Sequence, residues 1–331
     1  MQASLSSVAP RVVILATGGT IAGTAGSGDG ALGYRSAQLG VEALIAAVPA
    51  LAGRVLEAEQ VAQVDSKDMG VDLWRDLVVR IEHQLARSEV AGVVITHGTD
   101  TLEETAYLLQ RVLAPSKPVV LTAAMRPATA LQADGPQNLL DAVTLAALPE
   151  ARGVVAVVAG TVHGALEVRK VQTYRLDAFG SGEAGPIAVI EGGTLRRFRD
   201  WPAGVALGSA VLGTGPWPRV EIVASHAGAD GRLVEALLAQ GVDGLVVAGT
   251  GNATLHQALE AVLRRASAQG IEVRLCTRVP EGGVRPNGAQ SWPLGQAATP
   301  QQERIALQLE LLQRRAQPGR MRSVGGAGVT G

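Results

Sequence analysis

Two stretches of the chain combine glycines with hydroxyl side chains directly after an apolar run. The first, ATGGTIAG at 16–23, carries Thr17 and Thr20, and the second, THGTDTLEET at 96–105, carries Thr99 and Asp100. A threonine hydroxyl attacks a carbonyl carbon only when a base or a second hydroxyl takes its proton and when donors stabilise the oxyanion. Two such loops brought together would suit that chemistry.

Each loop also has a purely structural interpretation. The first fits a tight turn at the end of a strand. In the second, Thr101 and Glu104 have the spacing of a capping box at the start of a helix, which explains these two residues but not Thr99 and Asp100. Both interpretations stay open at this point.

Other chemistries fit the sequence poorly. A dinucleotide fingerprint requires G-x-G-x-x-G at the start of a helix, whereas a Gly-rich stretch follows Gly18, Gly19 and Gly23 here. The chain has no phosphate-binding G-x-x-x-x-G-K-[ST] loop and no G-x-S-x-G elbow, and its five histidines lack metal-ligand spacing. We therefore expect no metal and no cofactor, and we expect His97 to be a structural hydrogen-bonding residue.

Short, continuously apolar runs alternate with longer helical patterns, which is typical of a mostly parallel sheet covered on both faces. The predicted strands are 12–16, 93–96, 119–121, 154–158, 220–224, 244–248 and 272–276. The predicted helices are 41–48, 71–87, 102–112, 137–147, 233–240, 255–268 and 301–315.

This alternation predicts a two-domain α/β protein. We expect a larger N-terminal catalytic domain (1–195), in which helices flank a mostly parallel sheet, and a smaller flavodoxin-like C-terminal α/β domain (219–331). Residues 196–218 are rich in Trp, Pro and Gly and are expected to form the interdomain linker. Ligands of open α/β sheets bind beyond the carboxyl ends of strands, where both threonine-bearing loops lie.

Composition excludes several classes of protein. Lys and Arg number 29 against 30 Asp and Glu, a balance that argues against a nucleic-acid-binding protein. No apolar run is long enough to span a bilayer, and 1–10 has no signal-peptide pattern, so we expect no membrane association and a cytoplasmic location. Cys276 stands alone, which rules out an intrachain disulfide.

The two threonine motifs together resemble the signatures of the bacterial-type L-asparaginases, the asparaginase/glutaminase family. The resemblance continues through AMRP at 124–127, ADGPQNL at 133–139, GTGN at 249–252 and RVP at 278–280. It implies hydrolysis of L-asparagine to L-aspartate and ammonia through an acyl-enzyme, and a homotetramer built as a dimer of dimers. A glutaminase or related amidase with altered substrate recognition, and a non-catalytic aspartate- or asparagine-binding sensor of the same fold, remain alternatives.

The resemblance also implies catalytic roles for individual residues. Thr20 is expected to be the nucleophile, and Tyr34 to take its proton. Thr99, Asp100 and Lys170 resemble the family's second catalytic cluster, in which Lys170 polarises Thr99 or a water molecule. Without the resemblance, Lys170 belongs to an ordinary solvated charge run, EVRK at 167–170.

The expected substrate-binding residues are Gly19, Ser66, Lys67, Thr99, Asp100 and Asn252. Ser66 would bind the α-carboxylate, Asp100 the α-ammonium, and Asn252 would reach the site of a neighbouring subunit. Two positions depart from the family pattern: Lys67 replaces a Gln that contacts the ammonium, and Ala289 replaces an intersubunit Glu. Both changes predict weaker recognition of the α-ammonium unless Lys67 turns to the carboxylate or to solvent.

Overall fold

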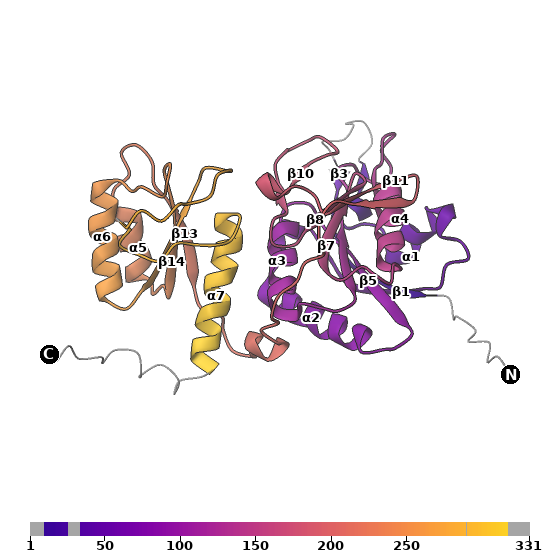
Figure 1. Ribbon diagram of the computed structural model, residues 1–331, viewed down its shortest axis with the longest axis horizontal. Coiled ribbons are helices and arrows are strands. Elements are labelled where there is room, and N and C mark those ends of the chain that lie inside the picture. The colour runs from indigo at the N-terminus through magenta and orange to yellow at the C-terminus, as the bar shows by residue number, and fades with distance from the viewer. Residues whose placement is uncertain (1–9, 26–33, 289, 317–331) are drawn as a thin grey trace. The chain divides into compact units, whose positions relative to one another are not determined.

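The computed structural model describes residues 10–25, 34–288 and 290–316 (Figure 1). The chain divides into two compact units, 1–209 and 210–331. Each unit has its own sheet and its own buried core.

An eight-stranded sheet forms the first unit, and five of its strands are parallel. In spatial order these five are β4 (Leu56–Val64), β1 (Arg11–Gly18), β5 (Val90–Thr96), β6 (Pro118–Thr122) and β7 (Gly153–Val158). Three antiparallel strands extend the sheet beyond β7: β8 (Thr161–Gly164), β11 (Ala188–Glu191) and β12 (Thr194–Arg197). β1, β5, β6 and β7 are buried along almost their whole length because helices cover both faces of the sheet.

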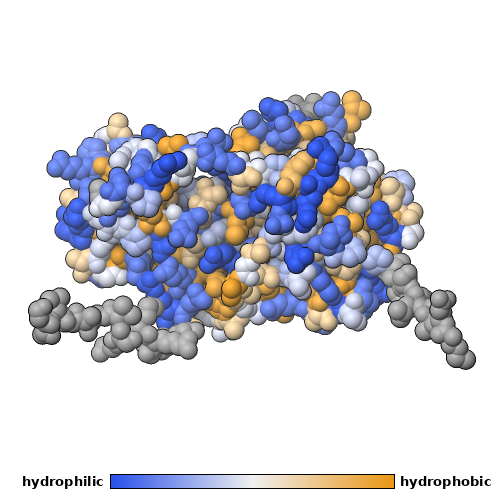
Figure 2. All heavy atoms as spheres, viewed as in Figure 1, coloured by the Kyte–Doolittle hydropathy of each residue, from blue (hydrophilic) through white to orange (hydrophobic). Residues whose placement is uncertain are grey.

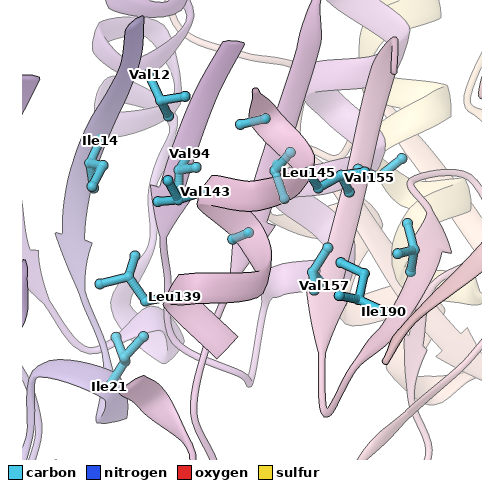
Figure 3. Close-up of a cluster of buried hydrophobic side chains, with 14 of the residues drawn as sticks. Val12, Ile14, Ile21, Val94, Leu139, Val143, Leu145, Val155, Val157 and Ile190 are labelled. Carbon is cyan, nitrogen blue, oxygen red and sulfur yellow. The ribbon is translucent and has the colours of Figure 1, made fainter. Parts of the chain in front are cut away.

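Helices α1 (Val41–Ala46) and α4 (Gly135–Ala146) cover one face of this sheet, and α2 (Val71–Leu85) and α3 (Leu102–Leu113) cover the other (Figure 1). Figure 3 shows Leu139, Val143 and Leu145 of α4 directed at sheet residues such as Val94 and Val155. Burial of such side chains stabilises the sandwich by about 1.5–3 kcal/mol each.

Short elements complete the first unit. Two-residue strands form the pairs β2 (Thr24–Ala25) with β3 (Tyr34–Arg35), and β9 (Arg169–Lys170) with β10 (Phe179–Gly180). The 3-10 helices are η1 (Thr20–Ala22), η2 (Pro49–Leu51), η3 (Ser66–Asp68) and η4 (Gly182–Ala184), and η5 (Ser209–Leu212) lies at the boundary between the units.

The second unit is a three-layer α/β sandwich. Its parallel strands β13 (Val220–Ala224), β14 (Gly244–Gly249) and β15 (Glu272–Thr277) lie side by side in that order. Side chains alternate along β14: Leu245 and Val247 join the core under α5 (Arg232–Ala239) and α6 (Gln257–Ala268), and the next residues face α7 (Pro300–Ala316). The expected smaller C-terminal α/β unit is thereby confirmed.

The order of strands reverses direction next to β1 in the first unit. From β1 the chain adds β4 on one side, and it then crosses to add β5, β6 and β7 on the other. Such a switch point leaves a crevice beyond the carboxyl ends of the two strands at which the direction changes. The loops after β1 and β5 carry the two threonine motifs, so both motifs lie at this position.

Every predicted strand and helix is present, with ends shifted by at most a few residues. Segment 196–218 differs from the expected linker because β12 extends to Arg197 and the first unit continues to residue 209. The N–H groups of Leu207 and Gly208 donate to the last turn of α3, and Trp201 is buried. Much of this segment is therefore part of the first unit.

In the described ranges, no helix is long and apolar enough to cross a bilayer. Hydrophilic residues cover most of the visible surface of each unit in Figure 2, with hydrophobic residues scattered between them.

Candidate active site

The two threonine-bearing loops contact each other through the backbone of two glycines, Gly19 and Gly98. Gly19 follows β1 with a φ of 83°, a conformation that strongly favours glycine. A Cβ atom placed on Gly19 would lie 2.5 Å from both Cα and N of Gly98, so no other residue fits without displacing a loop. Because Gly19 precedes Thr20 and Gly98 precedes Thr99, this contact brings the two motifs together.

Thr20 begins the 3-10 helix η1 and is 7% exposed. The next residue, Ile21, packs into the core against Leu139 of α4, which fixes η1 over the end of the sheet (Figure 3). The N–H of Gly19 donates to the carbonyl of Val64 at 3.0 Å. This N–H is therefore occupied by Val64, and what Gly19 contributes here is the close approach of its backbone to Gly98.

Lys170 lies against the second motif. Its Nζ donates to Oγ1 of Thr99 at 2.9 Å and to Oδ1 of Asp100 at 2.7 Å. The Thr99 side chain is buried, the Lys170 side chain is 22% exposed, and that of Asp100 is 54% exposed. Lys170 is thus no part of a solvated charge run, and it joins a threonine hydroxyl to a carboxylate that water can reach.

Ser66 connects η3 to the second motif through both its side chain and its backbone. The N–H of Asp100 donates to Oγ of Ser66 at 3.2 Å, and Oγ1 of Thr101 donates to the carbonyl of Ser66 at 2.7 Å. The capping-box interpretation is wrong for the Thr101 hydroxyl, because this group bonds a segment 35 residues away and caps no N–H of α3.

Lys67 turns to neighbouring carboxylates. Its Nζ lies 3.2 Å from Oδ2 of Asp65 and 2.9 Å from Oδ2 of Asp68, and its side chain is 60% exposed. Hydrogen bonds to Asp68 and Asp65 raise the pKa of Lys67 above its ordinary value. Burial alone would raise the pKa of Asp65, but bonds from Ser36 and Lys67 outweigh it and hold that pKa low.

His97 is a buried structural residue, as expected. Nε1 of Trp74 donates to Oγ1 of Thr105 at 2.9 Å, this hydroxyl lies 3.0 Å from Nε2 of His97, and Nδ1 of His97 lies 2.7 Å from the carbonyl of Gly98. A neutral ring that donates from Nδ1 satisfies the whole chain of hydrogen bonds. Burial lowers the pKa of His97 to about 4, which keeps the ring neutral.

The AMRP and ADGPQNL motifs hold the turn after β6. Asp134 accepts the N–H groups of Met125 and Arg126 at 2.9 Å each. Nη1 of Arg126 donates to the carbonyl of Tyr174 at 2.7 Å, and its guanidinium lies 3.9 Å from the centre of that ring. These residues therefore attach the segment after Lys170 to the end of β6.

The expected roles of Tyr34 and Asn252, and the effect of the replacement at Ala289, stay predictions. Tyr34 lies in β3, paired with Ala25, and its side chain lies outside the described residues, as does Ala289. Asn252 is in the second unit, where its side chain exchanges two hydrogen bonds with the backbone of Arg285. Its intersubunit role stays a prediction.

One residue of this region was not anticipated from the sequence. Oε2 of Glu103, in the first turn of α3, accepts the backbone N–H of Lys170 at 2.8 Å. Its position within the second motif was the available signal, but only the fold shows that β9 passes beside it. Among the residues that the structure describes, no group of three or more His, Cys, Asp or Glu is placed to hold a metal ion.

Comparison with known proteins covers nearly the whole chain. The family model "Asparaginase, N-terminal" matches residues 11–202, and "Glutaminase/Asparaginase C-terminal domain" matches residues 219–324. L-asparaginase 2 of Escherichia coli is 37% identical, with 92% of this chain and 89% of that protein aligned. L-asparaginase 2 of Bacillus subtilis is 36% identical over 91% of this chain and 82% of that protein.

A solved structure agrees with these matches. The crystal structure of a probable cytoplasmic L-asparaginase from Campylobacter jejuni superposes with a TM-score of 0.86 at 34% identity, covering 91% of this chain and 95% of that one. Both units match a family model, and the relatives share more than a third of their residues over most of the chain. The chain therefore belongs to the asparaginase family.

Proposed function

We propose that the protein is an L-asparaginase, which hydrolyses L-asparagine to L-aspartate and ammonia. The observation that carries the proposal is the contact of Lys170 with both Thr99 and Asp100, beside a loop that presents Thr20. This arrangement combines a polarised hydroxyl, a second hydroxyl on a touching loop and a water-accessible carboxylate.

In the proposed reaction Oγ1 of Thr20 attacks the side-chain amide carbon of the substrate. The C–N bond then breaks, and the nitrogen leaves as ammonia with the proton that Tyr34 has taken from the Thr20 hydroxyl. Water adds to the acyl-enzyme, the bond from Thr20 to the acyl carbon breaks, one proton of the water returns to the Thr20 oxygen, and L-aspartate leaves. Lys170 acts on Thr99 or on this water, because an ammonium at hydrogen-bond distance stabilises an oxygen that loses its proton.

Substrate recognition rests on opposite charges at the two ends of the amino acid. A carboxylate has about four lone-pair sites, so Asp100 can hold Lys170 through one oxygen and still accept from an α-ammonium. The hydroxyl of Ser66 accepts from the N–H of Asp100 and can donate its own hydrogen to the α-carboxylate. Charge-assisted bonds at both ends would orient the amide over Thr20.

Two alternatives predict different assay results. Ammonia release should be measured with L-asparagine, L-glutamine and the D-enantiomers, with Thr20→Ala as the control. Release from L-asparagine that Thr20→Ala abolishes supports the proposal, whereas a preference for L-glutamine would identify a glutaminase. Tight binding of L-aspartate without turnover of any of the four would indicate a sensor.

We also propose a homotetramer, a dimer of dimers, located in the cytoplasm. The family resemblance supports the tetramer, and the similarity to the Campylobacter jejuni protein, a probable cytoplasmic L-asparaginase, supports the location. A relative from Haemophilus influenzae is named as periplasmic, so location differs among these proteins. Light scattering of the purified protein tests the assembly, and fractionation of the source cells tests the location.

A further inference from the structure

Lys170 is held at both ends. Its ammonium contacts Thr99 and Asp100, and its backbone N–H donates to Oε2 of Glu103 at 2.8 Å. Glu103 and the residues that receive the ammonium belong to one short segment, 99–103, at the start of α3. The same segment therefore fixes both the backbone of Lys170 and the ammonium group at the end of its side chain.

The local strand cannot provide this precision alone. β9 has two residues, and it pairs only with the two residues of β10. Isolated two-stranded pairs are at best marginally stable, even when they are longer than this one. Backbone bonds of Val168 to Gly164 and of Val171 to Ala178 hold the chain on either side of Lys170, and the bond from Glu103 fixes Lys170 itself beside Thr99.

We propose that Glu103 is a positioning residue for the reaction: its carboxylate anchors the backbone of Lys170 so that Nζ reaches Thr99. The inference rests on the proposed function for its kinetic consequences, but the anchor itself can be tested without turnover. Glu103 acts through hydrogen-bond geometry and takes no part in proton transfer.

Geometry and charge are separable at this position. Glu103→Gln keeps an acceptor oxygen at the same distance from the backbone and removes the charge. Glu103→Asp keeps the charge, and its shorter side chain draws the acceptor away from the N–H. Glu103→Ala removes both. A positioning role predicts that Gln preserves activity and that Asp and Ala do not.

The three variants should be assayed for kcat and KM with L-asparagine, and for the pH profile of kcat. Misplacement by about 1 Å costs up to about 100-fold, so we expect kcat of Glu103→Ala and Glu103→Asp to fall about 10- to 100-fold. KM should stay within about threefold, since Ser66 and Asp100 remain in place. Glu103→Gln should keep kcat within about threefold with an unchanged pH profile.

Hydrogen exchange resolved to single amides supplies a readout independent of activity. The Lys170 amide should lose protection in Glu103→Ala, while the Val171 amide, which donates to the carbonyl of Ala178, should keep it. Glu42→Ala is the matched control, an exposed glutamate in the first turn of α1. If Glu103→Ala does not fold, Glu103→Asp and Glu103→Gln still decide the question.

Three results would overturn the proposal: wild-type kcat in Glu103→Asp, a loss in Glu103→Gln as large as that in Glu103→Asp, or unchanged protection of the Lys170 amide in a folded variant that lacks the anchor. Absence of ammonia release by the wild type would instead refute the proposed function, while the exchange measurement would still test the anchor.

Discussion

Lys170→Met should slow the reaction strongly while leaving the protein folded. Methionine is similar in length but removes both bonds from Nζ, 2.9 Å to Thr99 and 2.7 Å to Asp100. A hydrogen bond to a charged group contributes about 1.5–3 kcal/mol, and a positioned acid–base group contributes about 100- to 10,000-fold in rate. We therefore expect kcat to fall by about that factor, equivalent to about 3–5 kcal/mol in the activation free energy.

The assay is ammonia release from L-asparagine under saturating and limiting substrate, so that kcat and KM are obtained separately. Lys117→Met is a matched control, since Lys117 is also partly buried and its Nζ donates to two acceptors, the carbonyls of Leu85 and Arg87. This control should lower the thermal midpoint without lowering kcat. If Lys170→Met retains kcat within about threefold of the wild type, Lys170 has no part in the chemical step.

Two other perturbations test the surroundings of the site. Lys67→Gln should lower KM for L-asparagine about two- to fivefold at constant kcat, a small effect because Lys67 is exposed and paired with two carboxylates; a higher KM would mean that Lys67 assists binding. Because the pKa of His97 is about 4 in the folded chain and about 6.5 when unfolded, stability present above pH 6.5 should be lost as pH falls towards 4. Denaturant titrations at pH 6.5 and pH 4 give the drop in unfolding free energy for the wild type and for His97→Asn. The drop should be about 3 kcal/mol smaller in His97→Asn, and equal drops would contradict the neutral, buried state of His97.

The buried parallel strands were predictable because their residues are apolar without interruption, as in β5 and β7. β4 was not predicted, since polar residues interrupt LEAEQVAQV and the strand lies at the sheet edge, half covered. The antiparallel strands β11 and β12 are four residues each, too short for periodicity to show. The hydrophobic pattern of the sequence therefore predicted the central strands of the sheet and missed the strands at its two edges.

Within the site, sequence located the two hydroxyl loops but misjudged local bonds. Thr101 had the spacing of a cap, yet its hydroxyl bonds the carbonyl of Ser66, a contact that only the tertiary fold creates. Lys170 stood among charged residues, and without the family resemblance nothing in the spacing distinguished it from a solvated side chain. Glu103 was missed for the same reason, because its partner is a backbone N–H 67 residues away.

The contact of Gly19 with Gly98 has a consequence for how this family can vary. Main-chain atoms meeting at van der Waals distance leave no rotamer to adjust, so the separation of the Thr20 loop from the Thr99 loop is a fixed dimension of the scaffold. Selection for new substrates, or redesign in the laboratory, must therefore act on nearby exposed side chains such as Lys67, while the backbone contact between the two loops stays the same.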